Sequence, residues 1–339
     1  MKDTPKIELI KQILEESGEK TFRLAQIRKQ IYQSSAASFD KMTDISLGLR
    51  QKLSSKIPNL LSLTVATTTN NTNTQKILFL TANKHPVETV FMDYNGHTTI
   101  CISTHSGCPL GCEFCATGKM PSSKSLNVDE ITDQILHFVK LGKRPDNIVI
   151  MGMGEPLINP DIFNVLDVLT SKDYFGYGQR HISISTVGIV PNLIKLNKTY
   201  PQINLAFSMH SPFDEEREKL MPINKAYPLD DVFSALNKHV KLNKRKIFVS
   251  YIMLKNVNDS DSHANEIARL INKQGDSKYL FHVNLIKFHK YEQSIFTPSD
   301  NEKIRRFSIM LKRLGINNTI RKDFGEEIKG ACGQLAGSK

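Results

Sequence analysis

From residue 100 to residue 314, short apolar runs alternate with longer segments whose apolar residues recur at helical spacing. The short runs predict six strands: Ile100–Ser103, Ile148–Met151, Ile182–Ser185, Leu205–Ser208, Ile247–Met253 and Leu280–Ile286. The longer segments predict the helices that follow them: Val128–Leu141, Ile162–Leu169, Val190–Leu196, Leu229–Leu242, His263–Ile271 and Glu302–Leu314. Strands and helices that alternate in this way form a parallel sheet with right-handed crossovers. The sequence therefore predicts an α/β fold whose sheet closes partway into a TIM-like barrel, a partial (βα)6 arrangement.

The first 84 residues follow a different pattern and predict a small, mostly helical domain. Its helical segments are Ile7–Leu14, Phe22–Ile31 and Leu47–Leu53. Two strand-like runs, Leu61–Ala66 and Ile77–Thr81, flank a polar low-complexity tract, Thr67–Thr74, which predicts a mobile turn. A hairpin is expected next, because Asn95-Gly96 separates two alternating runs. We therefore divide the chain into an N-terminal accessory domain, 1–84, and a core, 85–339.

The balance of charge suggests a polyanionic partner. The chain has 339 residues, a formal net charge of +11 and a pI of about 9.3. Lys and Arg side chains that contact phosphates release condensed counterions, although plain solubility explains the same excess equally well. No apolar stretch is long enough to span a bilayer, and the N-terminus lacks the apolar core of a signal peptide. A cytoplasmic protein without a membrane partner is expected.

The five cysteines predict a metal or redox site, because the odd, clustered set in a chain without a secretion signal does not resemble a disulfide framework. Three of them share the loop after the first strand, with the spacing C-x3-C-x2-C: Cys108, Cys112 and Cys115. Thiolates suit iron–sulfur clusters, and three of them leave one iron of a [4Fe–4S] cluster open to a substrate. The spacing alone leaves two alternatives: a zinc site completed by His105, or an electron-transfer cluster completed by Cys101.

The loops after the next three predicted strands carry glycines and hydroxyl groups. Gly152, Gly154 and Glu155 follow the second strand, Ser185 ends the third, and Ser208–Pro212 follows the fourth. Glycine lets the backbone approach a ligand closely, and the Glu155 carboxylate can accept hydrogen bonds from an ammonium group. Each loop alone is also compatible with a tight turn or a structural histidine. Together they predict one ligand site, because the loops at the C-terminal ends of parallel strands lie at the same edge.

Five motifs resemble the radical S-adenosylmethionine (SAM) rRNA adenine methyltransferases, the RlmN/Cfr family, over nearly the whole chain. They are Phe22–Ile27, Cys101–Cys108, Met151–Pro156, Leu220–Asn224 and Ala331–Leu335. The last motif is the most specific of them, because most radical SAM enzymes have no cysteine at this place.

The resemblance implies a role for each candidate residue. Cys108, Cys112 and Cys115 would bind the [4Fe–4S] cluster. Six residues would hold SAM: Gly154, Glu155, Ser185, Ser208, Met209 and His210. Cys332 would carry the methyl group, Cys101 would form a disulfide with it, and Glu88 would accept a proton. His289 stands where the family usually has an asparagine near SAM, so that role is not carried over.

The resemblance also implies the reaction and its partners. Two SAM molecules would be used per turnover, one to methylate Cys332 and one to generate the 5′-deoxyadenosyl radical. The substrate would be adenosine 2503 of 23S rRNA, methylated at C8, with antibiotic resistance as the result, or at C2, with transfer RNA as a second substrate. The stretches Tyr200–Leu205, Ser211–Arg217 and Tyr251–Leu254 favour the C8 type, whereas Met151–Pro156 favours the C2 type. A flavodoxin- or ferredoxin-type reductant and a monomer are expected; the rival classes are an electron-transfer protein and a zinc-stabilised RNA-binding module.

Basic residues offer contacts for the RNA phosphates. They form three groups: Lys241, Lys244, Arg245 and Lys246; Lys287, His289 and Lys290; and Arg305, Arg306, Lys312 and Arg313. Residues 1–84 are predicted to form a second RNA-binding surface. For each group the alternative is a solvated face with no partner.

Overall fold

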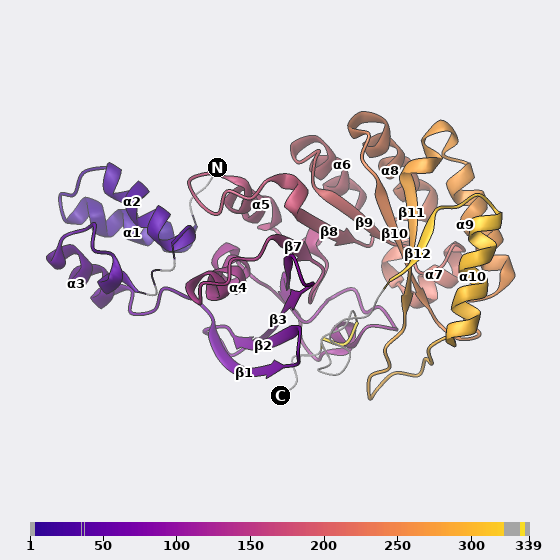
Figure 1. Ribbon diagram of the computed structural model, residues 1–339, viewed down its shortest axis with the longest axis horizontal. Helices are drawn as coiled ribbons and strands as arrows, with labels where there is room; N and C mark the ends of the chain where they lie inside the picture. The colour runs from indigo at the N-terminus through magenta and orange to yellow at the C-terminus, as the bar shows by residue number, and fades with distance from the viewer. Residues whose placement is uncertain (1–3, 35, 37, 322–332, 336–339) are drawn as a thin grey trace.

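A ten-stranded sheet runs through the molecule (Figure 1). The computed structural model describes residues 4–34, 36, 38–321 and 333–335. The strands lie in the order β1 (Thr64–Asn70), β2 (Thr74–Leu80), β3 (Pro86–Asp93), β4 (Thr98–Ile102), β7 (Asn147–Ile150), β8 (Ile182–Thr186), β9 (Asn204–Ser208), β10 (Ile247–Met253), β11 (Phe281–Lys287) and β12 (Asn318–Ile320). Neighbours from β4 to β12 pair parallel, and those from β1 to β4 pair antiparallel.

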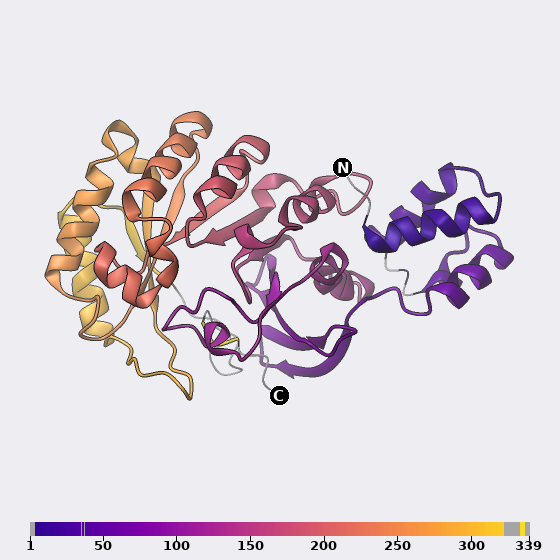
Figure 2. The same ribbon diagram turned by 180° about the vertical axis from the view of Figure 1, so that it is seen from behind.

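Helices cover the outer face of the parallel strands (Figures 1 and 2). They are α4 (Val128–Lys140), α5 (Ile162–Thr170), α6 (Val190–Thr199), α8 (Leu229–Asn243), α9 (Asp261–Asn272) and α10 (Asn301–Arg313). Their apolar faces and the strands share one core, because a helix stripe and a sheet face can each be buried only against another element. The predicted α/β partial barrel of βα units is confirmed. Its C-terminal strand ends form the edge at which the predicted ligand loops emerge.

Three short elements at this edge were not predicted as helices or strands. β5 (His105–Ser106) and β6 (Lys124–Ser125) form a separate two-stranded pair. The helix α7 (Asp214–Leu220) follows β9 and leads into a 3-10 turn, Pro222–Lys225. At seven residues, α7 is too short to show a helical period in the sequence.

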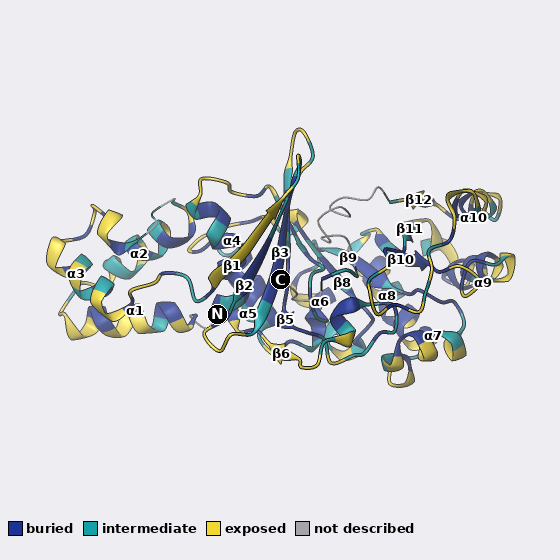
Figure 3. Cartoon of the chain, turned by 90° about the horizontal axis from the view of Figure 1, so that it is seen from below, coloured by how far each residue is buried: buried dark blue, intermediate teal, exposed yellow. Residues whose placement is uncertain are grey.

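The polar tract Thr67–Thr74 is not the mobile turn that its composition suggests. Residues 67–70 belong to β1 and pair with residues 75–78 of β2, so the turn shrinks to residues 71–73. Threonine is β-branched and favours extended backbone, and the partner strand supplies its hydrogen bonds. Every residue of β1 is exposed, which explains why the strand needs no apolar alternation (Figure 3).

The N-terminal helices lie at one end of the molecule (Figure 1). They are α1 (Pro5–Glu16), α2 (Phe22–Tyr32) and α3 (Leu47–Lys56), as predicted. β1 and β2 also precede residue 84, yet they continue the same sheet as β3. The sheet thus crosses the expected boundary, and the division into 1–84 and 85–339 stays a prediction.

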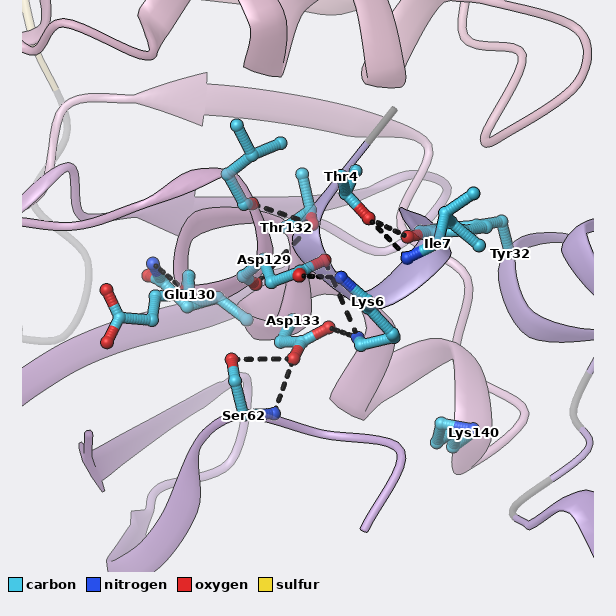
Figure 4. Close-up of polar contacts among 12 residues, drawn as sticks. Thr4, Lys6, Ile7, Tyr32, Ser62, Asp129, Glu130, Thr132, Asp133 and Lys140 are labelled. Carbon is cyan, nitrogen blue, oxygen red and sulfur yellow. Dashed lines mark hydrogen bonds and ion pairs between the residues drawn. The ribbon is translucent and has the colours of Figure 1, made fainter. Parts of the chain in front are cut away.

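A buried ion-pair junction joins α1 to α4 (Figure 4). The Lys6 ammonium lies 2.5 Å from Asp133 Oδ1, and the Lys6 backbone N–H donates to Asp129 Oδ2 at 2.7 Å. The second oxygen of Asp133 accepts from the backbone N–H and the hydroxyl of Ser62, at 2.6 and 2.8 Å. Burial raises the pKa of the Asp129 carboxyl, and the Lys6 charge opposes that rise. The N-terminal helices are therefore held to the barrel by charge as well as by apolar packing.

Replacing Lys6 by methionine should lower the free energy of unfolding by about 3 kcal/mol, because the Asp129 and Asp133 carboxylates are left buried without their cation. Denaturant unfolding measures the change. The matched control is Lys273→Met, which breaks an exposed ion pair with Asp230 and should cost less than about 1 kcal/mol. Equal losses in the two variants would contradict a stabilising role for the buried junction.

No helix in the described part of the chain combines the length and the apolar character that crossing a bilayer requires.

Candidate functional site

A cavity opens at the C-terminal edge of the parallel strands. It encloses about 1140 Å³, including the part open to solvent. Loops after successive strands line it, as the sequence predicts. The predicted site residues that reach it are Cys101, Cys108, Cys112, Cys115, Gly154, Glu155, Ser185, Ser208 and His210. The structure therefore brings together side chains that are up to 109 positions apart in the sequence.

Three of the cysteines in the cavity come from the loop after β4, and Cys112 is the most buried of them. Burial raises the pKa of the Cys108 thiol to about 12 and that of Cys112 well above its ordinary value, and the neighbouring thiols raise both further. These sulfurs would therefore stay protonated at neutral pH unless a metal held them as thiolates. The donor set is entirely soft, which fits an iron–sulfur cluster.

The zinc alternative lacks its ligand geometry. Within the residues described, no three His, Cys, Asp or Glu side chains are grouped so as to hold one metal ion. A zinc ion needs all its ligands within about 2.3 Å of one point, whereas each thiolate of a four-iron cluster binds a different iron. His105, the expected fourth zinc ligand, is buried, and its Nδ1 is hydrogen-bonded to the Thr104 hydroxyl at 2.9 Å. The three cysteines fit a cluster better than a single ion.

Two glycines let the loop after β7 pack against the chain that leads into the cysteine loop. A Cβ on Gly154 would lie 2.2 Å from Nδ1 of His105, and Gly154 has a φ of +97°. A Cβ on Gly152 would lie 2.6 Å from the Ser103 hydroxyl oxygen. Both distances are far below van der Waals contact, so no larger residue fits without moving one of the loops. The close approach of the two loops therefore explains why glycine stands at both positions of the Gly-x-Gly motif.

Glu155 joins the loop after β7 to the end of β8. Its Oε1 accepts from the Leu157 N–H at 3.0 Å, and its Oε2 accepts from the Val187 N–H at 2.9 Å. Desolvation raises the pKa of this carboxyl to about 7, and the hydrogen bonds that it accepts oppose the rise. The sequence predicted that Glu155 accepts from an ammonium group; in the structure its carboxylate already fixes two amides of the cavity wall.

Hydroxyl and imidazole groups line the next part of the wall. Ser185 of β8 and Ser208 of β9 lie side by side, with their hydroxyl oxygens 3.2 Å apart. His210 adopts a φ of +59°, and its Nδ1 accepts from the Ile252 N–H at 3.0 Å, so its proton is on Nε2. Burial lowers the pKa of His210 to about 3, and the Arg217 charge lowers it further. The imidazole is therefore a neutral hydrogen-bond donor at this wall.

Comparisons with known proteins agree with this geometry. Residues 102–270 match the radical SAM superfamily, and residues 6–58 match the ribosomal RNA large subunit methyltransferase N-terminal domain. The crystal structure of a radical SAM methyltransferase from Sphaerobacter thermophilus has a TM-score of 0.90 and 34% identity, covering 98% of each chain. The chain is 41% identical over 333 residues to the ribosomal RNA large subunit methyltransferase Cfr of Staphylococcus aureus, covering 97% of this chain and 95% of the relative. It belongs to the RlmN/Cfr family of radical SAM rRNA methyltransferases.

A second Cfr methyltransferase, from Lachnoclostridium phytofermentans, is 39% identical over 338 residues, with 98% of each chain covered. Membership of the radical SAM superfamily implies a [4Fe–4S] cluster and SAM as cofactors. The cavity suits both, because its three soft ligands stand beside a wall of glycine backbone, hydroxyl groups and a neutral imidazole.

Three residues singled out from the sequence do not line the cavity. The Met209 side chain is fully buried, and its backbone N–H donates to the Ser250 carbonyl at 3.1 Å. Glu88 of β3 is buried, with its Oε1 2.9 Å from the Lys76 ammonium. His289 is buried as well, after the end of β11. The roles that the RlmN/Cfr resemblance implies for Met209 and Glu88 stay predictions.

Cys332 lies outside the described residues, but its neighbour Gly333 reaches the cavity. The Gly333 carbonyl accepts from the Ala116 N–H at 2.9 Å, and the Leu335 carbonyl accepts from the Thr117 hydroxyl at 2.5 Å. Leu335 also packs against Val90 and Met153. No disulfide occurs among the described cysteines, so the expected Cys101–Cys332 disulfide is not supported here and stays a prediction.

Sequence reasoning missed several residues of this site. Met221, Ser250, Ile252, Ile286 and Arg321 also line the cavity. Ser250, Ile252 and Ile286 lie in strands whose sequences carry only an apolar signal, and nothing in the sequence marks the side that faces a ligand. Arg217 lies behind the wall in α7, a segment that reads as a solvated charged stretch.

Proposed function

We propose that this chain methylates C8 of adenosine 2503 in 23S rRNA, with Cys108, Cys112 and Cys115 as ligands of a [4Fe–4S] cluster. The cavity carries this proposal. It joins three cysteines to a wall with few charges, to Cys101 and to Gly333, the residue that follows Cys332 in the sequence. Cfr rRNA methyltransferases match nearly the full chain, and the stretches Tyr200–Leu205, Ser211–Arg217 and Tyr251–Leu254 resemble the C8 type of the family. C2 methylation is the alternative, because Pro156 in the loop after β7 resembles the C2 type.

We assign the remaining roles as follows. When bound, the cluster supplies the electron that cleaves SAM reductively, and each turnover uses two SAM molecules. Cys332, as a thiolate, takes the methyl group of the first by displacement, because an adenine ring carbon is too weak a nucleophile to do so. The 5′-deoxyadenosyl radical from the second SAM takes a hydrogen atom from the S-methyl group of Cys332, and the carbon radical that is left adds to the adenine ring. Glu88 then accepts the proton that leaves the ring carbon. The Cys101 sulfur then bonds to the Cys332 sulfur while the bond from Cys332 to the methylene carbon breaks. The Cys101 proton completes the methyl group of the leaving base, and the remaining electron returns to the electron donor.

The wall residues hold SAM in this proposal. The Gly154 backbone approaches its amino end, where only glycine fits. Ser185 and Ser208 supply hydroxyl groups from adjacent strands, and His210 supplies a neutral Nε2–H donor. A flavodoxin- or ferredoxin-type protein supplies the electron, and the enzyme acts as a monomer; transfer RNA belongs to the C2 alternative.

The basic groups predicted to contact RNA phosphates lie at different ends of the parallel strands. Lys287 is the last residue of β11 and Lys290 follows it, at the same edge as the cavity, and Arg321 lines the cavity itself. The residues from Lys241 to Lys246 precede the start of β10, so they lie at the opposite ends of the strands. Arg245 donates to the Asn204 side chain there. We therefore assign the phosphate contacts to the cavity edge and propose the N-terminal helices as a second RNA-binding surface.

Nucleoside analysis tests the proposed reaction. The protein is expressed in a host that lacks its own enzyme, and rRNA nucleosides are analysed by mass spectrometry. We expect 8-methyladenosine in 23S rRNA. Finding 2-methyladenosine instead would replace the C8 assignment by C2, and finding neither would overturn the proposal. Anaerobic reconstitution gives an independent control: a colourless protein with one tight zinc would favour the RNA-binding alternative.

A further inference from the structure

Arg217 is the largest fully buried side chain in the described residues, and it lies behind the cavity wall. Its guanidinium donates to the Met209 carbonyl at 2.9 Å, the Ser208 carbonyl at 3.0 Å and the Val187 carbonyl at 2.8 Å. Ser208 ends β9, and Val187 follows β8. One side chain therefore ties together the ends of two neighbouring strands, directly under the hydroxyl and imidazole groups that line the cavity.

The hydrogen-bond acceptors of Arg217 are all neutral. The fourth is the side-chain oxygen of Asn224, at 2.5 Å. The nearby Asp214 carboxylate accepts instead from the Asn224 amide and the Leu229 N–H, both at 2.9 Å. A buried cation without an ionised partner is costly, so a fold that keeps one needs negative charge within reach. Two groups lie within electrostatic reach of the Arg217 charge: Asp214, and on the cavity side Cys112, whose sulfur is negative only as a ligand of the proposed cluster.

The segment that carries Arg217 also contacts the cysteine loop. The Glu113 N–H, between Cys112 and Cys115, donates to the Leu220 carbonyl at 2.9 Å. Met221 lines the cavity, and Asn224 holds Arg217 in place. These contacts give a physical reason for the motif Leu220–Asn224, to which the proposed reaction assigns no step.

We propose that Arg217 is a positioning residue of the cofactor site. Its guanidinium fixes the carbonyl groups behind the SAM wall, and its charge offsets the negative charge of the three thiolates and of the cluster that they hold. The positive charge favours the reduced cluster, which is the more negative of its two states. This inference rests on the cofactor assignment made under the proposed function, but not on the choice of RNA substrate.

Two substitutions separate charge from geometry. Arg217→Gln removes the charge and should lower the equilibrium constant for cluster reduction about tenfold, which shifts the potential by about 59 mV to more negative values. It should also weaken SAM binding about tenfold, because three carbonyls lose their donors. Arg217→Lys keeps the charge but not the planar fork, so its potential should stay near that of the wild type while SAM binding weakens. The anaerobically reconstituted enzyme is measured by potentiometric titration and by equilibrium binding of SAM, without RNA.

Arg144→Gln is the matched control. Arg144 donates to the carbonyls of Tyr32 and Phe175, away from the cavity, so its loss should lower stability and leave both the potential and SAM binding unchanged. If Arg217→Gln behaves like Arg144→Gln, Arg217 is merely structural and the inference is wrong. If Arg217→Gln does not fold, Arg217→Lys decides, and unchanged SAM binding in that variant would overturn the inference. A wild-type protein that takes up no cluster would instead refute the proposed function.

Discussion

Replacement of Cys332 by alanine is expected to abolish methylation of rRNA while the iron and sulfide content of the reconstituted protein stays unchanged. The proposed carrier role requires a sulfur at this position, since the adenine carbon cannot take the methyl group from SAM directly. Cluster binding is assigned to a different segment, the loop after β4. Methylation is measured by transfer of labelled methyl groups from SAM to rRNA, and cluster content by iron and sulfide analysis.

Cys101→Ala is the companion variant, and it should fail at a later step. Without the second sulfur, no disulfide can form as the product leaves, so we expect RNA to remain covalently attached to Cys332. Denaturing electrophoresis detects this adduct, which should be absent from the Cys332→Ala protein. Residual methylation by Cys332→Ala, or release of free product by Cys101→Ala, would contradict the assigned roles.

The regular part of the fold could be predicted because each βα unit carries its own signal. The helix α4, for example, is capped by Asn127, which forms a reciprocal pair of hydrogen bonds with Glu130, and the helix buries one apolar face. The elements that escaped prediction lack such a signal. The helix α7 is a charged segment of only about two turns. Residues 67–70 of β1 are exposed, and they become a strand only because β2 pairs with them.

The sequence predicts which loops form the site, but it does not predict which atoms their side chains contact. Parallel strands place their C-terminal ends together, and this rule alone unites Cys108, Gly154, Ser185 and Ser208. The rule does not predict which partners a side chain of these loops contacts. Glu155 turns to the amides of Leu157 and Val187, which depends on how the loops after β7 and β8 approach each other.

Substitution of Gly154 by alanine should reduce the rate of methylation about 100-fold. The new Cβ would lie 2.2 Å from Nδ1 of His105, so the loop after β7 must move by roughly an ångström away from the cysteine loop. A displacement of this size at a reacting centre costs about two orders of magnitude in rate. SAM binding should weaken as well, because the Gly154 backbone is proposed to contact the amino end of SAM. Both are measured on protein reconstituted with the cluster.

Gly176→Ala separates the steric effect from backbone strain. Gly176 has a φ of +69°, but a Cβ there meets no heavy atom closer than 3.8 Å. Both variants place alanine in the left-handed region, which costs on the order of 1–2 kcal/mol of stability. Only Gly154→Ala should also lose SAM binding and activity. Equal activity in the two variants would mean that contact between the loop after β7 and the cysteine loop does not position the cofactor. Loss of SAM binding and activity in Gly154→Ala alone would show that the Gly-x-Gly pair acts by letting those two loops pack closely.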